Sequence, residues 1–118
     1  MRDRQNLASL GENIAKQYLR DRGYVIRECN WRCKIGELDI IATIFNLTVF
    51  VEVKTKTSTS YGYPEDMVHA RKRRKLTQLV DAYCKQKNIK DNYQLDVIAI
   101  LINGSKAIIR HIKNIEID

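Results

Sequence analysis

Two short runs of the sequence carry acidic and basic side chains at spacings that suit phosphodiester chemistry. The first is Glu37-Leu38-Asp39 and the second is Glu52-Val53-Lys54. Carboxylate oxygens are the ligands that Mg²⁺ prefers, usually one or two together with waters and phosphate oxygens. A cation held there polarises a phosphodiester and activates a water, and a neighbouring lysine stabilises charge in the transition state.

The two runs lie in neighbouring apolar segments, residues 37–43 and 47–55. We interpret these segments as an antiparallel hairpin, because only a few residues separate them. If the turn centres on Phe45-Asn46, the numbers of opposed residues sum to 91. Asn46 tolerates the left-handed backbone of such a turn, whereas Phe45 is a poor turn residue, so a slipped register stays open.

This register brings charged residues together. Asp39 faces Glu52, and Glu37 faces Lys54. Because opposed residues share a face and side chains alternate along a strand, we expect these four side chains on one face. The other face is expected to receive the intervening apolar residues, Leu38, Ile40, Val51 and Val53. The alternative interpretation is a solvated strand face with an ordinary cross-strand Glu–Lys pair.

Other segments must position this hairpin. The helical spacing of Leu7, Leu10 and Ile14 predicts a helix over about residues 6–22, which Gly23 ends. We further expect a strand at 24–28, a basic loop at 30–35, a loop at 56–64, a helix at about 65–87, and strands at 93–102 and 106–112 joined by Asn103-Gly104. The order α-β-β-β-α-β-β predicts one α/β domain over residues 1–118, with a mixed sheet flanked by helices.

The composition narrows the class of partner. A net charge of +7 and a pI near 9.5 favour a polyanion such as nucleic acid as the binding partner. A nucleic acid releases counterions when Lys and Arg side chains bind its phosphates. The alternative is that the charge serves solubility alone. The longest apolar segment, residues 40–51, is interrupted by polar residues and is shorter than the about 20 residues of a membrane-spanning helix.

The N-terminal residues and the cysteines predict the compartment. The first six residues are polar and lead into an amphipathic stretch, which differs from a secretory signal. Three cysteines are an odd number, so a disulfide framework is not expected and a reducing, cytoplasmic location fits. Cys29 and Cys33 lack a second Cys/His pair for zinc, since His69 and His111 are isolated.

The segments 36–42 and 49–54 resemble the core of the YraN-like proteins. These are small bacterial predicted endonucleases of the PD-(D/E)XK, restriction-endonuclease-like superfamily, related to archaeal Holliday junction resolvases. The likeness covers nearly the whole chain. Further matching positions are Gly11-Glu12, Gly23-Tyr24, Asn30-Trp31-Arg32, Tyr61-Gly62, Arg71-Lys72 and residues 95–99.

The resemblance implies roles for individual residues. Asp39 and Glu52 become metal ligands for Mg²⁺ or Mn²⁺, and Lys54 becomes the catalytic lysine. Glu12 corresponds to a helix-borne acidic residue near the metal in related resolvases, so the resemblance adds it to Asp39 and Glu52 as a catalytic, metal-binding residue. Glu37 belongs to the matching motif in a supporting role, either on the metal or orienting Lys54 and Arg32.

The sequence departs from the family pattern at two places. Leu38 stands where the superfamily has a proline, and Gln94-Leu95 replaces the family's usual Arg-Phe before Asp96. The second departure puts any role of that arginine in doubt. Asp96 itself interrupts an apolar strand, and we expect a buried, hydrogen-bonded structural carboxylate there.

A run of cations, Arg71-Lys72-Arg73-Arg74-Lys75, predicts phosphate contacts on the second helix. The alternative is a solvated helical face without a ligand. By family position Lys72 is expected to face the site. The cations that extend this surface are Arg32, Lys34, Lys56 and Lys113. Trp31 and Tyr61 either stack on an unpaired base or pack in the core.

Three functions compete. The first is a Mg²⁺-dependent endonuclease acting on DNA, including branched or structured forms. The second is a non-catalytic nucleic-acid-binding protein that retains the nuclease fold. The third is an interaction module whose basic helix binds an acidic protein. Related resolvases act as dimers because a junction offers two strands to cut, so a homodimer is a further expectation from the resemblance.

Overall fold

The computed structural model describes residues 2–57 and 70–116. The elements in chain order are α1 (Arg2–Asp21), β1 (Val25–Arg32), β2 (Glu37–Ile44), β3 (Leu47–Lys56), α2 (Ala70–Lys87), β4 (Tyr93–Asn103) and β5 (Lys106–Ile115). This order confirms the predicted mixed α/β class with the succession α-β-β-β-α-β-β, and it is consistent with a restriction-endonuclease-like fold.

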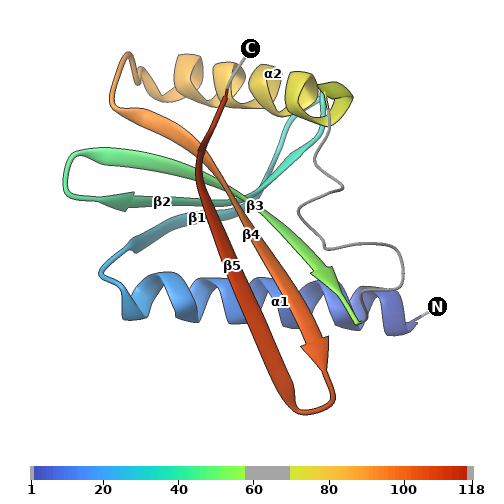
Figure 1. The fold of residues 1–118 in the computed structure, drawn as a ribbon. Helices are drawn as coiled ribbons and strands as arrows, with labels where there is room; N and C mark the ends of the chain where they lie inside the picture. The colour runs from blue at the N-terminus through green and yellow to red at the C-terminus, as the bar shows by residue number, and fades with distance from the viewer. Residues whose placement is uncertain (1, 58–69, 117–118) are drawn as a thin grey trace.

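The strands of the described residues form one five-stranded sheet in the order β1-β2-β3-β4-β5. Only β3 and β4 are parallel, and α2 lies in the connection between them, as a parallel crossover requires. The helices α1 and α2 cover opposite faces of the sheet (Figure 1). The central strand is therefore β3, which carries Glu52 and Lys54.

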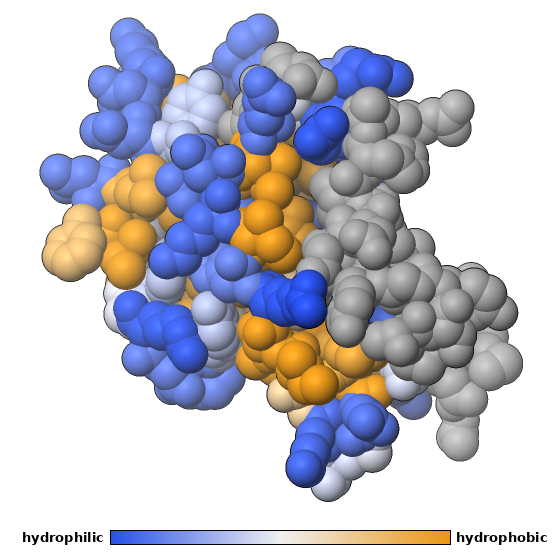
Figure 2. All heavy atoms as spheres, viewed as in Figure 1, coloured by the Kyte–Doolittle hydropathy of each residue, from blue (hydrophilic) through white to orange (hydrophobic). Residues whose placement is uncertain are grey.

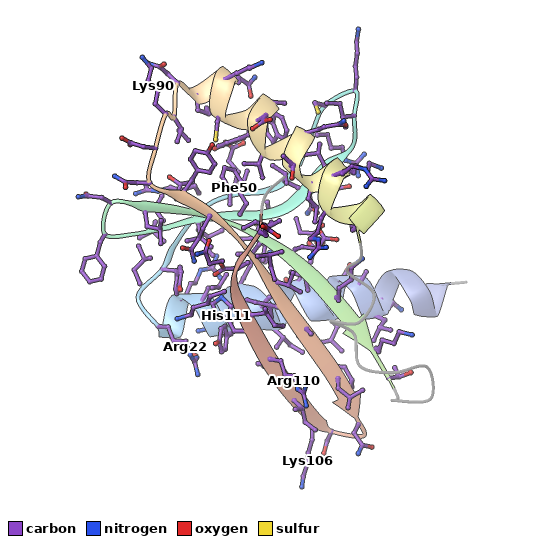
Figure 3. The ribbon with its side chains drawn as sticks, turned by 45° about the horizontal axis from the view of Figure 1, so that its top comes forward. Arg22, Phe50, Lys90, Lys106, Arg110 and His111 are labelled. Atoms are coloured by element: carbon purple, nitrogen blue, oxygen red, sulfur yellow. The ribbon has the colours of Figure 1, made fainter. Side chains whose placement is uncertain are left out.

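Two apolar clusters lie on the two faces. Phe50 of β3 lies between the sheet and α2 (Figure 3), in a cluster with the buried α2 residues Leu76, Leu79 and Val80. On the other face, β-strand residues pack against Ala15 and Leu19 of α1 in a second cluster, with members Ile40, Ala42, Val49, Val51, Ile98 and Ile100. Burial on both faces explains why β3 and β4 are nearly continuous apolar runs.

Several boundaries differ from the sequence-based expectation. The helix α1 begins at Arg2, and β1 continues to Arg32, so a loop beginning at residue 30 was wrong. The extension follows from pairing, because Trp31 and Arg32 lie opposite Leu38 and Glu37 of β2. Most of the expected loop at 56–64 and the expected start of the second helix at 65 lie outside the described residues.

The edge strand β5 is the most exposed part of the sheet. Hydrophilic side chains cover much of the face that β5 occupies, with apolar surface between them (Figure 2), and Ile108 is 52% exposed. Lys106 at the hairpin tip and Arg110 further along β5 add charge to this edge (Figure 3), which opposes edge-to-edge pairing. Within residues 2–57 and 70–116, neither helix is long and apolar enough to cross a membrane.

Candidate active site

The strands β2 and β3 separate at the acidic residues. Their ladder runs from Ile44 opposite Leu47 to Ile40 opposite Val51, where the numbers sum to 91, which confirms the predicted register over these pairs. The expected pairs Asp39–Glu52 and Glu37–Lys54 lie beyond the end of the ladder. Beyond it, Oδ2 of Asp39 accepts a 2.8 Å hydrogen bond from the backbone N–H of Val53. A side-chain carboxylate thus satisfies an amide that the ladder leaves without a backbone partner on β2.

We call the place where β2 and β3 separate the fork. Residues at the fork line a pocket of about 270 Å³. Asp39, Glu52 and Lys54 all line it, and Glu12 of α1 joins them. The structure therefore brings together the four residues that the resemblance placed at the site. The remaining lining residues are Ala8, Val53 and Thr55.

Gly11 lets α1 reach this pocket. A Cβ atom at Gly11 would lie 1.9 Å from Oγ1 of Thr55, so only a glycine allows the helix to approach β3 this closely. Glycine in a helix interior costs about 1 kcal/mol relative to alanine, and close packing is the compensation. Glu12 follows directly in sequence and is carried to the pocket rim by this contact.

Glu37 does not join the acidic group. Its Oε1 lies 3.6 Å from Nε of Arg32, the residue opposite it on β1, and Glu37 does not line the acidic pocket. The expected alternation was also wrong for Leu38, which packs in the α2-side cluster, whereas Ile40 and Val51 pack on the α1 side. The alternation breaks because the side chain of Asp39 enters the fork between the strands.

The ammonium groups of two lysines contact the same carboxylate oxygen of Glu52. Nζ of Lys54 lies 3.3 Å and Nζ of Lys72 lies 3.1 Å from Oε2. The side chain of Glu52 is only 6% exposed, so water screens these interactions little. Lys72 comes from α2, on the opposite side of the sheet from Glu12, and the site is therefore built from both helices and two strands.

The carboxyl group of Asp39 has a raised pKa. Burial raises its pKa to about 8, and the neighbouring charges of Glu52 and Glu12 act in the same direction. The hydrogen bond from Val53 lowers the pKa without cancelling these effects. The side-chain hydrogen bond between Asp39 and Glu52 also raises the pKa of Asp39, so Asp39 holds a proton near neutral pH. A divalent cation would replace that proton and relieve the repulsion.

The donor set fits Mg²⁺ or Mn²⁺ better than zinc. Among the described residues no three acidic, His or Cys side chains already form a metal-binding group. Mg²⁺ needs only one or two carboxylates, with waters and phosphate oxygens completing its shell, and the pocket has room for them. The three cysteines are free thiols, and none of them lines this pocket.

The predicted phosphate-binding residues divide into groups. Lys72 reaches the acidic pocket, whereas Arg74 and Lys75 are exposed on α2 and Arg73 is half-buried. Arg32 is 77% exposed, and Lys56 ends β3 half-buried. The side chain of Arg71 lies outside the described part of the chain, as does Tyr61.

Trp31 belongs to the core packing. Its ring stands edge-on to Tyr83 at 5.2 Å, and its Nε1–H donates a 3.2 Å hydrogen bond to Oε1 of Gln86. These contacts hold α2 against β1. They favour the core-packing interpretation of this tryptophan over base stacking.

A buried polar network around Asp96 was found only in part from the sequence. Asp96 is fully buried and accepts hydrogen bonds from Gln94, from the backbone N–H of Asn114, and from His111 at 2.7 Å. The prediction of a buried, hydrogen-bonded aspartate is confirmed. The role of His111 was missed, although a lone carboxylate in an apolar strand signals that a donor must face it. Tyr18 of α1 completes the network, because its hydroxyl oxygen lies 3.1 Å from Nδ1 of His111.

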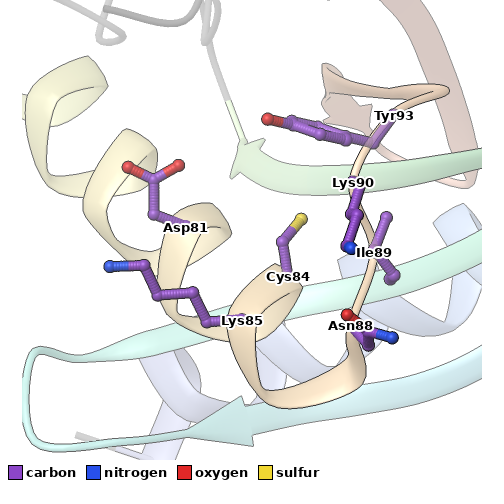
Figure 4. A pocket seen from close by; sticks show the side chains of 7 residues that line it. All are labelled: Asp81, Cys84, Lys85, Asn88, Ile89, Lys90 and Tyr93. Carbon is purple, nitrogen blue, oxygen red and sulfur yellow. The ribbon is translucent and has the colours of Figure 1, made fainter.

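A second and larger pocket, of about 350 Å³, lies between the end of α2 and the start of β4 (Figure 4). Cys84 and Tyr93 face it, with Lys85 and Lys90 at its edge. Burial raises the pKa of the Cys84 thiol, and Asp81 adds to the shift, so the thiol stays protonated and unreactive. This pocket has no carboxylate pair among its lining residues, so the smaller, acidic pocket is the candidate active site.

Comparisons with known proteins agree on one family. The model of the uncharacterised protein family UPF0102 matches residues 11–100. A UPF0102 protein of Caldanaerobacter subterraneus subsp. tengcongensis is 40% identical over 115 residues, covering 96% of this chain and 93% of the relative. A UPF0102 protein of Clostridium botulinum strain 657 is 40% identical over 114 residues, covering 93% of each chain.

Proposed function

Since this chain belongs to the uncharacterised protein family UPF0102, we propose its activity from the acidic pocket: it is a metal-dependent endonuclease that hydrolyses DNA phosphodiester bonds. Membership confirms the resemblance to the YraN-like proteins at the level of the family. The family description states no activity. The nuclease superfamily, the metal and the DNA substrate are therefore parts of the proposal.

One observation carries the proposal. Asp39, Glu52 and Lys54 line a single pocket at the point where β2 and β3 separate, with Glu12 beside them. A solvated strand face would leave these groups apart and exposed. Instead Glu52 is almost completely buried and Asp39 is hydrogen-bonded inside the fork, an arrangement that costs folding free energy and suits a functional site.

Each group has a role in this chemistry. Asp39 and Glu52 would hold Mg²⁺ or Mn²⁺, and Glu12 stands where it can hold one of the waters around the ion. A bound divalent ion supplies polarisation of the phosphodiester and a lowered pKa of bound water. Lys54 places a positive charge beside the carboxylates, where it can orient the attacking water and stabilise negative charge on the phosphoryl oxygens.

The basic surface supports a nucleic-acid substrate. The side chains of Arg73, Arg74 and Lys75 follow Lys72 on α2, the helix that reaches the pocket. Such cations hold a phosphate backbone in place without reading its sequence. The proposal therefore favours recognition of backbone shape, including branched or otherwise structured DNA, over recognition of a base sequence.

A non-catalytic nucleic-acid-binding protein is the alternative. One observation favours it, because Lys54 and Lys72 already neutralise the carboxylate of Glu52. In that case the acidic pocket would be a structural ion-pair network beneath a basic surface. The two functions predict the same affinity for DNA and differ in cleavage.

The test is cleavage of linear duplex, single-stranded and four-way-junction DNA with Mg²⁺ or Mn²⁺. Glu52→Ala and Lys54→Ala serve as site variants, and Lys106→Gln at the distant hairpin tip is the matched charge control. The endonuclease proposal expects metal-dependent cleavage that both site variants lose and the control retains. Salt-dependent binding without cleavage that responds to these variants would establish the alternative.

A further inference from the structure

The carboxylate of Glu52 contacts two lysine ammonium groups, one more than the run Glu52-Val53-Lys54 on β3 supplies. Lys54, two residues away on β3, approaches Oε2 at 3.3 Å, and Lys72 of α2 approaches the same oxygen at 3.1 Å. Because the carboxylate is 6% exposed, neither contact is a weak surface pair. One carboxylate oxygen of this proposed metal ligand is thus shared between two positive groups.

A divalent cation cannot join this arrangement unchanged. It would bring two further positive charges to a carboxylate that already has two ammonium groups within 3.3 Å of one of its oxygens. One lysine must withdraw, since like charges at this distance repel strongly in a site with little water. Lys72 is the more exposed of the two, at 34% against 23% for Lys54, and it lies near the beginning of the described part of α2.

A phosphate offers the withdrawing lysine a new partner. Lys72 is followed by Arg73, Arg74 and Lys75, so a polyanion that lies along this part of α2 places phosphate oxygens near the lysine. The ammonium group then exchanges a carboxylate for a phosphate and stays paired throughout. No comparable exchange is open to Lys54, whose position on β3 keeps it inside the acidic pocket.

We infer that Lys72 is a substrate-responsive latch: it pairs with Oε2 of Glu52, a proposed metal ligand, in the free protein and moves to a nucleic-acid phosphate when substrate binds. This inference rests on the proposed function and adds its regulation. Lys72 acts through Glu52 and is therefore a positioning residue. Metal and nucleic acid bind with positive coupling, and by thermodynamic reciprocity each tightens the other by the same factor. Metal-dependent chemistry is thereby confined to the substrate complex.

The test measures Mn²⁺ affinity of the whole chain without nucleic acid, by electron paramagnetic resonance or calorimetry. Lys72→Gln and Lys72→Met should each tighten Mn²⁺ binding by about tenfold, the scale of typical coupling between sites. Lys85→Gln removes an equal charge from the exposed last turn of the same helix, away from the residues assigned to metal and phosphate, and it should leave the Mn²⁺ affinity unchanged. Lys72→Arg keeps the charge and should resemble the unchanged protein.

A second measurement follows Mn²⁺ affinity as a short DNA duplex is added. The unchanged protein should gain more affinity than Lys72→Gln, because only the former has a latch to open. Equal or weaker Mn²⁺ binding by the Lys72 variants without DNA, or equal gains on adding DNA, would overturn the latch. Neither readout is cleavage, so a failed latch with intact metal-dependent cleavage is distinct from a failed nuclease with an intact latch.

Discussion

Oδ2 of Asp39 lies 2.8 Å from the backbone nitrogen of Val53, where it replaces a strand-to-strand hydrogen bond with a carboxylate-to-amide one. This contact does two things at once. It ends the β2–β3 ladder by filling the fork between the strands, and it holds a carboxylate beside Glu52 at the pocket. Structure and chemistry therefore depend on different properties of one side chain: its hydrogen-bonding oxygen and its charge.

The substitution Asp39→Asn separates these two properties. The amide oxygen of asparagine still accepts the hydrogen bond from Val53, so the variant should fold. Loss of a metal ligand should lower cleavage by about a thousandfold, because a bound metal supplies several kcal/mol of transition-state stabilisation and each 1.4 kcal/mol is about tenfold in rate.

Asp39→Ala is the control for the hydrogen bond. It removes the acceptor as well and should lower the free energy of unfolding by about 1–3 kcal/mol relative to Asp39→Asn, since a buried amide loses its partner. Thermal unfolding of both variants and cleavage with Mg²⁺ check these outcomes. Full cleavage by Asp39→Asn would remove Asp39 from the site.

The raised pKa of Asp39 predicts a pH dependence of stability in metal-free buffer. Its pKa is about 8 in the folded protein and about 4 in an unfolded chain, so the folded state binds more protons between these values. The stabilising contribution is complete below about pH 4 and is lost as pH rises through about 8, at up to about 1.4 kcal/mol per pH unit.

Mg²⁺ should oppose this loss, because it takes the place of the proton. Its stabilising effect should be larger at pH 9 than at pH 6, and Asp39→Asn should flatten the metal-free profile over this range. Melting temperatures measured with a chelator and with Mg²⁺ across this pH range test the expectation. A profile that is the same in the unchanged protein and in Asp39→Asn would contradict it.

The sequence predicted the hairpin and its register because the information is local. Two apolar segments flank a turn of two residues, and the pairing numbers follow once the turn is placed. Phe45, judged a poor turn residue, adopts a φ of 53° and is 99% exposed, so the core packing of Ile40, Val49 and Val51 on either side outweighs the strain at the turn.

What the sequence did not reveal depends on residues far apart in the chain. Family position indicated that Lys72 faces the site, but its contact with Glu52 requires knowing how α2 crosses the sheet. The resemblance left open whether Glu37 lies on the metal or beside Arg32, and their pairing depends on the extended β1. Strict alternation failed at Asp39, because hydrogen bonding to Val53 prevailed over the regular pleat. Family resemblance supplied Glu12, which no local pattern distinguishes from other helical glutamates.

Gly11→Ala tests the approach of α1 to the pocket. Alanine is the better helix former by about 1 kcal/mol, yet its Cβ would meet Oγ1 of Thr55 at 1.9 Å. The helix must move away, so we expect a net destabilisation of about 1–3 kcal/mol and weaker cleavage. Thr55→Ala in the same chain should recover part of the stability, as measured by denaturant unfolding. A stabilised Gly11→Ala protein would show that the contact is not tight.

His111→Ala tests the network around Asp96. It leaves a fully buried carboxylate without its closest partner, and it should lower the free energy of unfolding by about 3–5 kcal/mol. The double variant Asp96→Asn/His111→Ala removes the buried charge as well and should be more stable than the single variant. Neither residue lines the acidic pocket, so cleavage per folded molecule should persist.

Arg74→Gln tests whether α2 lies along a phosphate backbone. Arg74 is exposed on the helix that carries Lys72, and a phosphate contact there releases one counterion from DNA. The variant should bind DNA more weakly at low salt, and the slope of log affinity against log salt should become shallower by about 0.9. The loss should be equal for unrelated sequences, because phosphate contacts carry no base information. Lys106→Gln, at the tip of the β4–β5 hairpin, removes the same charge from a different surface, and an equal change in its slope would show that DNA binding follows net charge rather than contact with α2.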